Sequence, residues 1–328
     1  MDPAQFLTAS GVLIVAGKGG VGKTAVTAAL AVAASSVGAK TLVVEVEGKG
    51  GMPALFGADG LTYEDAVLIH AAEEHADGTH GGVTARTITP DDALLDYLAD
   101  HGLQRISNRL VASGALDLVA TAVPGIRDIL VLGKIKQLER TGEWDLILLD
   151  APAAGHAITF LRSARGLADA VKVGPIYHQA ADVLELLCDP QRCRVALVTA
   201  PEETPVNEVI ETAYSLEDEV GVALGPVVVN GVFPDLPGLA ADPQQLATEA
   251  GVTLFEGEAD LLRDAAAFRS QRTALQQHQL QRMAEELPLP QIHLPYLFTS
   301  QLGRTELDQL AASALNEIAR LNTVEAAS

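Results

Sequence analysis

The sequence is short of basic and aromatic residues, and the shortage of basic residues excludes whole classes of partner. Lysine and arginine number 22 against 43 aspartate and glutamate residues, which gives a formal net charge of −21. Nucleic acid and anionic lipid are themselves negatively charged, so a surface this acidic repels both. Aromatic residues make up 4% of the 328 residues, yet 48% are hydrophobic, which is ample for a large buried core. We therefore expect no nucleic-acid partner.

Cysteine is almost absent as well. The two cysteines, Cys188 and Cys193, occur together in "CDPQRC". We expect two reduced thiols at a helix–strand junction. A zinc half-site is the alternative, although the spacing is not Cys-x-x-Cys and no second cysteine pair exists to complete the site.

Long apolar runs are also missing. No run approaches the ~20 residues that a helix needs to cross a bilayer. The first residues have no basic start and no cleavage site after a long apolar stretch, so they are interpreted as a lead-in to a strand. The sequence predicts a soluble, cytoplasmic protein with no stable membrane insertion.

What is present is an alternation of short apolar runs with helical stretches. Buried strands are predicted at residues 12–16, 41–46, 144–150, 193–200, 225–232 and 290–297. Helices are predicted at residues 24–36, 182–187, 205–220 and 259–286. The alternation predicts an α/β fold with a doubly wound, mostly parallel sheet, in a single domain over residues 1–328.

One region, residues 61–137, breaks this alternation. Its strand signal is limited to "VTARTI", and helices fit "PDDALLDYLADHGL" and "RDILVLGKIKQL" better. We predict that residues 61–137 form a helical subdomain inserted between two core strands.

The stretch "GKGGVGKT", residues 17–24, fits the phosphate-loop pattern G-x-x-x-x-G-K-[ST]. It follows a predicted strand and opens a predicted helix, which is the context that such a loop needs. Lys23 is expected to reach the β- and γ-phosphates, and the Thr24 hydroxyl to bind Mg²⁺. Nucleotide contacts are predicted for Gly17, Gly19, Gly20, Val21, Gly22, Lys23, Thr24 and Ala25, where glycines let backbone N–H groups approach phosphate oxygens.

A second lysine, Lys18, lies early in the same loop. Its side chain cannot easily curl back to the phosphate that Lys23 binds. One interpretation is a solvated surface lysine. The other is that Lys18 reaches the nucleotide of a second subunit and stabilises charge at the transferring phosphoryl group, as an arginine finger does.

The loop resembles the deviant Walker A motif of the SIMIBI class of P-loop ATPases. That class includes partition ATPases, septum-site ATPases, nitrogenase iron protein and the arsenite-pump ATPases. The resemblance implies that ATP or ADP with Mg²⁺ is bound, and that Lys18 acts across a nucleotide-sandwich dimer.

Later motifs resemble the arsenite-pump and tail-anchored-protein-targeting ATPases within this class. "WDLILLD" followed by "APAAGHAITFL" is similar to their switch II signature "DTAPTGHTLRFL". By that resemblance Asp150 holds the Mg²⁺ shell through water and Gly155 senses the γ-phosphate. A local alternative is that Asp150 caps a helix.

Three further stretches extend the resemblance over nearly the whole chain. "VPGIRDILVLGKI" is similar to the family's "PGIDEA" helix, and "VTAPEETPVNEV" to its "PE…PV.E" turn. "VVVNGV" and "LPYL" are similar to the segments that embrace adenine, which implies that Asn230, Pro295 and Tyr296 contact the base.

Switch I departs from the family pattern. Where the family has "TDPAHNLSDAF", this chain has "VEGKGGMPALF", so Glu47 stands at the position of the water-positioning aspartate. A glutamate is one methylene longer, so Glu47 is a slower catalytic acid, a degenerate one, or a structural acid at a strand end. The altered switch I leaves open a nucleotide-dependent scaffold with little hydrolysis as the alternative to an active ATPase.

"VEVEG" at switch I also resembles one partner of the paired arsenite-pump-like ATPases of actinobacteria. We therefore expect a dimeric ATPase, as a homodimer or as a heterodimer with a paralogue, that couples ATP to an unknown client. The cysteines match no metalloid-binding position of the family. The three methionines do not lie in the inserted helices, unlike those of the tail-anchored-protein carriers.

Overall fold

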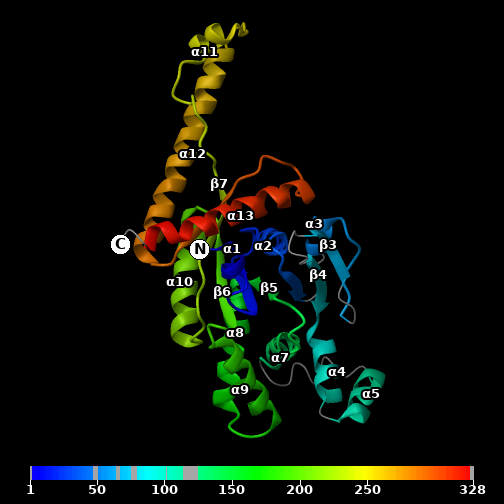
Figure 1. The fold of residues 1–328 in the computed structure, drawn as a ribbon. Helices are drawn as coiled ribbons and strands as arrows, with labels where there is room; N and C mark the ends of the chain where they lie inside the picture. Colours follow the sequence, from blue (N-terminus) through cyan, green and yellow to red (C-terminus); the bar gives the residue numbers. More distant parts are fainter. Residues whose placement is uncertain are drawn as a thin grey trace.

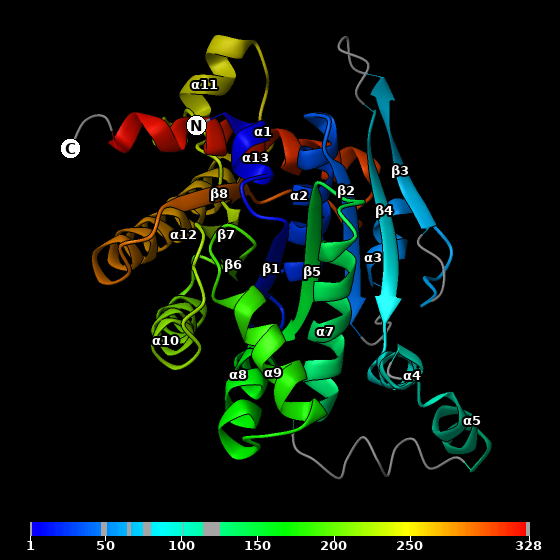
Figure 2. The same cartoon turned by 60° about the horizontal axis from the view of Figure 1, so that its bottom comes forward.

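The computed structural model describes residues 2–46, 51–63, 67–74, 80–100, 102–113 and 125–325. These residues form an eight-stranded sheet in the order β3-β4-β2-β5-β1-β6-β7-β8 (Figures 1 and 2). Every neighbouring pair is parallel except β3 and β4, which are antiparallel. The strands are β1 (Val12–Gly17), β2 (Lys40–Val46), β3 (Val67–Glu74), β4 (His80–Ile88), β5 (Leu146–Ala153), β6 (Cys193–Thr199), β7 (Val227–Val232) and β8 (Gln291–Pro295).

Helices cover both faces of the sheet, as the alternation of elements predicts (Figure 2). One face packs against α7 (Ile126–Arg140), α8 (Ala154–Ala170), α9 (Pro175–Leu187) and α10 (Glu203–Glu219). The other packs against α1 (Pro3–Leu7), α2 (Lys23–Ser36) and α13 (Arg304–Glu325). The predicted doubly wound α/β fold is therefore confirmed.

Helix α2 follows the phosphate loop and is the most buried helix of this second layer. All residues from Val26 to Ser35 are buried, and most of them are alanine or valine. Such small side chains let α2 lie close to the sheet on one side and to α13 on the other. The start of α2 is thereby held firmly at the edge of the sheet.

The segment predicted as a helical insertion carries strands as well as helices. The expected helices are present as α4 (Pro90–Asp100) and α7, with α5 (Gln104–Ser113) between them. "VTARTI" lies in β4, but β3 was not predicted, and β3 with β4 extends the sheet beyond β2. A short helix, α3 (Gly51–Phe56), precedes this segment.

A long arm projects from the carboxyl end of β7 (Figure 1). It consists of α11 (Pro243–Ala250) and the first part of α12 (Glu258–Glu286), and almost every residue from Glu258 to Leu275 is exposed or partly exposed. The last part of α12 packs on the body through the buried residues Gln276, Leu280 and Met283. Among the described helices none is long and apolar enough to cross a membrane.

Candidate nucleotide-binding site

The loop between β1 and α2 lies at the carboxyl edge of the central strands, and two glycines make its path possible. A Cβ atom at Gly17 would lie 2.2 Å from the carbonyl oxygen of Val198 on β6. Gly22 has φ +88° and caps α2, and a Cβ there would lie 2.3 Å from Asn230 Nδ2. Only glycine fits either position, because one lacks space and the other lacks both space and a favourable backbone conformation.

The two lysines of the loop point to different partners. Lys23 Nζ donates a hydrogen bond to the Lys18 carbonyl oxygen at 3.0 Å, so its ammonium group crosses the mouth of the loop. Lys18 Nζ instead forms an ion pair with Glu208 on α10, with both side chains partly exposed. Glu208 ends the "PE…PV.E" stretch, but nothing in the sequence indicates that it meets Lys18, which is 190 positions away.

Thr24 and Asp150, the two residues predicted to hold magnesium, lie next to each other. Thr24 Oγ1 donates to Asp150 Oδ2 at 2.8 Å, and Asp150 is buried at the carboxyl end of β5. A hydroxyl and a carboxylate are hard oxygen ligands of the kind that Mg²⁺ takes together with substrate phosphates and water. These two residues therefore fit a magnesium ion that neutralises phosphate charge when nucleotide is bound.

Glu45 is a site residue that the sequence reading missed. It is 1% exposed, lies opposite Asp150 in the register of β2 and β5, and its Oε1 accepts from Gly51 N at 3.2 Å. Gly51 opens α3, and a Cβ on it would lie 3.4 Å from Thr24 Cγ2. The sequence feature that could have identified Glu45 is a carboxylate in the otherwise apolar strand "TLVVEV". Burying a charged group is unfavourable unless a partner compensates it, so such a residue points to a site.

The three predicted base-contacting residues, Asn230, Pro295 and Tyr296, line one pocket of about 230 Å³ together with Ala25, a predicted nucleotide contact of the phosphate loop. Asn230 Nδ2 donates to the Val21 carbonyl oxygen at 2.9 Å, which ties the end of β7 to the phosphate loop. The structure thus brings together residues that are 205 or more positions apart in the sequence. Gln276 of α12 continues this link, since its side chain accepts from Phe233 N at 2.8 Å and donates to the Gly231 carbonyl oxygen at 3.2 Å.

The remaining predicted residues fall in three groups. Gly19 and Gly20 lie in the loop, where Gly20 has φ +90°. Gly155 lies in the first turn of α8, directly after β5. Glu47, the predicted water-positioning acid, lies outside the described residues.

The two cysteines form no disulfide in the described part of the chain. Cys188 and Cys193 are both free thiols, and burial raises the pKa of Cys193 to about 12. Among the described residues no group of three or more His, Cys, Asp or Glu side chains is arranged to hold a metal ion. The expectation of two reduced thiols is consistent with this arrangement.

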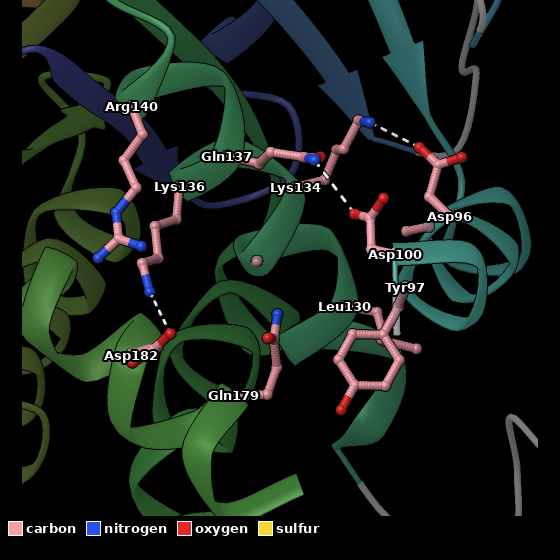
Figure 3. A pocket seen from close by; sticks show the side chains of 12 residues that line it. Asp96, Tyr97, Asp100, Leu130, Lys134, Lys136, Gln137, Arg140, Gln179 and Asp182 are labelled. Atoms are coloured by element: carbon pink, nitrogen blue, oxygen red, sulfur yellow. Dashed lines mark hydrogen bonds and ion pairs between the residues drawn. The ribbon is translucent and has the colours of Figure 1, made fainter. Parts of the chain in front are cut away.

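A second pocket of about 200 Å³ lies away from the loop, between α4, α7 and α9 (Figure 3). Charged side chains line it in pairs: Lys134 with Asp96 at 2.5 Å and Lys136 with Asp182 at 2.5 Å. Burial opposes the ionisation of Asp96, but hydrogen bonds from Lys134 and Tyr63 together hold its pKa below the usual range. Its polar lining makes this pocket unlike an apolar groove for a membrane segment.

Strand–glycine loop–helix geometry, a lysine across the loop and a threonine bonded to an aspartate at the neighbouring strand end define a P-loop nucleotide-binding protein. Comparison with known proteins agrees: the CobQ/CobB/MinD/ParA nucleotide binding domain family matches residues 12–141.

Relatives identify the branch. ATPase BagA of Mycobacterium tuberculosis is 35% identical over 254 residues, which cover 75% of this chain and 70% of that protein. The arsenical pump-driving ATPase of Escherichia coli is 27% identical over 77% of this chain and 45% of its own length. ATPase get3 of Schizosaccharomyces japonicus is 26% identical over 52% of each chain. The chain belongs to the family of ArsA/Get3-like P-loop ATPases, and its resemblance to that family is confirmed.

Proposed function

We propose that this ATPase works as a nucleotide-switched dimer in the cytoplasm, in which ATP and Mg²⁺ bind at the carboxyl edge of the sheet and close two subunits on each other. The observation that supports this proposal is the separation of the two loop lysines. Lys23 lies across its own loop, whereas Lys18 points away to Glu208 at a partly exposed position. A cation held at the surface beside a phosphate loop is available to the triphosphate of a facing subunit.

In this proposal Glu208 holds Lys18 while the subunits are apart. On closure the ammonium group exchanges the Glu208 carboxylate for phosphate oxygens of the second subunit. Because the Lys18–Glu208 pair is partly exposed, it is weak and the exchange is inexpensive. The second subunit is another copy of this chain or a paralogue.

We further propose that Glu47 orients the attacking water and that Glu45 organises the adjoining edge. Glu45 accepts a hydrogen bond from Gly51 N at the start of α3, and Gly51 lies beside Thr24, with room there for no more than a Cβ atom. The chain continues from α3 to Tyr63, whose hydroxyl donates to Asp96 of α4 at 2.6 Å. Asp96 also pairs with Lys134 of α7, so contacts run from the magnesium edge to the helices that would meet a client.

Sedimentation velocity with ATP, with ADP and without nucleotide tests the dimer. Wild-type chain, alone or with its paralogue, is expected to form a dimer with ATP that ADP does not support. Lys18→Ala should lose the ATP-dependent dimer while keeping ATP binding. Glu208→Gln, which frees Lys18, should strengthen it. A dimer that is indifferent both to nucleotide and to Lys18→Ala would refute the proposal.

A further inference from the structure

The first part of α12 carries a stripe of large apolar side chains that no described residue covers. Leu261, Phe268 and Leu275 are 71%, 67% and 58% exposed. They are seven positions apart, which is close to two turns of helix, so they lie on one face of α12. Apolar anchors at this spacing on a projecting helix are typical of helix-to-helix contact.

This stripe is symmetric about its central residue. If two copies of α12 cross antiparallel at Phe268, the two Phe268 side chains meet at the centre. Leu261 of each copy then lies at the level of Leu275 of the other. The three anchors would therefore fill the contact from both sides, as an isologous interface requires.

The charges follow the same symmetry. Asp264 and Arg272 are each four positions from Phe268, so the antiparallel crossing sets Asp264 of one copy at the level of Arg272 of the other. Ten positions away on either side, Glu258 of one copy lies at the level of His278 of the other, so no like charge opposes it. Between Glu258 and His278, no residue of one copy lies opposite a residue of like charge on the other copy. A contact between two chains of net charge −21 needs such local complementarity.

Arg272 is exposed enough to pair with Asp264 of a second copy. It forms an ion pair with Glu202 at 3.4 Å, and both side chains are largely exposed, so the pair is weak. Glu202 caps α10, the helix that also carries Glu208, the partner of Lys18. Arg272 therefore lies beside the start of α10.

We infer that α12 is a self-association surface, on which a second copy of this chain docks antiparallel with its own α12, crossing at Phe268. The contact does not involve the nucleotide site, so it goes beyond the nucleotide-driven closure proposed above. A single helix crossing buries less than the roughly 1,000 Å² typical of a stable interface, so the association through α12 alone is weak.

A charge exchange on the full chain tests the pairing. Sedimentation equilibrium without nucleotide is expected to show that Asp264→Arg and Arg272→Asp each weaken self-association about tenfold, because each sets like charges opposite one another. The double variant should return to within about threefold of wild type. Positions 264 and 272 lie about 12 Å apart on one helix, so restoration within one chain is not expected.

Cysteine cross-linking tests the crossing point. In a Cys188→Ser background, Phe268→Cys is expected to form a disulfide-linked dimer under mild oxidation, whereas Ser270→Cys, on the far side of α12, should not. Lys18→Ala in the same background should leave the cross-link unchanged, which separates this contact from nucleotide-driven closure.

Three results would each overturn the inference: a double charge variant as weak as the single variants, equal cross-linking at positions 268 and 270, or a wild-type chain that stays monomeric at high concentration.

Discussion

At the carboxyl edge of the sheet, carboxylates are buried and paired, whereas on the α11–α12 arm large apolar side chains lie in solvent. Asp150 and Glu45 are among the least exposed acids, and each has a hydrogen-bond donor from a neighbouring element. Leu261 and Phe268 reverse this pattern, being apolar and mostly exposed. Both arrangements are costly to an isolated chain, because buried charge and exposed apolar surface are each unfavourable. In the two proposals made above, nucleotide completes the edge and a second protein chain completes the arm.

The largest expected effect is the loss of Lys23. Lys23→Ala should lower kcat/KM for ATP about 1,000-fold, because it removes a preorganised cation from the transferring phosphoryl group. Phosphate release measures the rate. Val252→Ser, an exposed position on the arm, serves as the matched control and should keep wild-type activity. If Lys23→Ala retained a tenth of the wild-type rate of phosphate release, the carboxyl edge of the sheet would not be the catalytic site.

The two acids of switch I should separate in their effects. Glu47→Gln is expected to lower kcat about 100-fold with little change in ATP affinity, because a water-orienting group acts mainly in the transition state. Glu45→Gln keeps an acceptor for Gly51 N but loses the charge beside Thr24 and Asp150, so it should raise the Mg²⁺ concentration needed for half-maximal activity. Single-turnover kinetics over a Mg²⁺ titration distinguishes the two. If both variants behaved alike, the division of roles between them would be wrong.

Substituting one buried and one exposed leucine of α12 compares how much each part of the helix contributes to stability. Leu280→Ala should lower the free energy of unfolding by about 2 to 3 kcal/mol, since Leu280 is buried against the body. Leu275→Ala, five residues earlier, should change it by less than about 0.5 kcal/mol. Urea unfolding monitored by circular dichroism provides both values. Equal losses would mean that the arm contributes to the stability of the fold itself.

Two glycines of the phosphate loop give smaller effects than the loss of Leu280. Gly20→Ala should lower the free energy of unfolding by about 1 kcal/mol, because the φ of Gly20 is +90°. The added Cβ would meet no atom within 4 Å, so no steric term is added. Gly22 has a similar φ, and a Cβ there would also displace Asn230 Nδ2. Gly22→Ala should therefore lower the free energy of unfolding by about 2 kcal/mol and weaken nucleotide binding. Thermal unfolding and ATP titration test the pair. Identical behaviour would show that the Asn230 contact contributes nothing.

The sequence predicted the central sheet and the loop well because their signals are local. Short apolar runs marked β1, β2 and β5 to β8, and a contiguous motif marked Lys23 and Thr24. β3 was missed because "VLIHAAEE" mixes apolar residues with His and Glu, and its state depends on pairing with β4.

The missed site residues were hidden for a related reason. Glu45 is adjacent to a motif that directed attention to Glu47. Glu208 and Gln276 gain their importance only from tertiary contacts, with Lys18 in one case and with Gly231 and Phe233 in the other. Gln276 has no local pattern that distinguishes it from other polar residues on helices, and the "PE…PV.E" stretch that ends in Glu208 does not show that this residue meets Lys18.

Gln276 lies at the point on α12 where a small tilt of the helix would move the far end of the arm most. This side chain fixes α12 beside the residues that line the base pocket, and 18 residues of helix extend beyond it to Glu258. At 1.5 Å per residue that length is about 27 Å, so a tilt of about 10° at Gln276 would displace the far end by about 5 Å. A change too small to alter the sheet would thus be magnified into a movement about as large as the pitch of a helix.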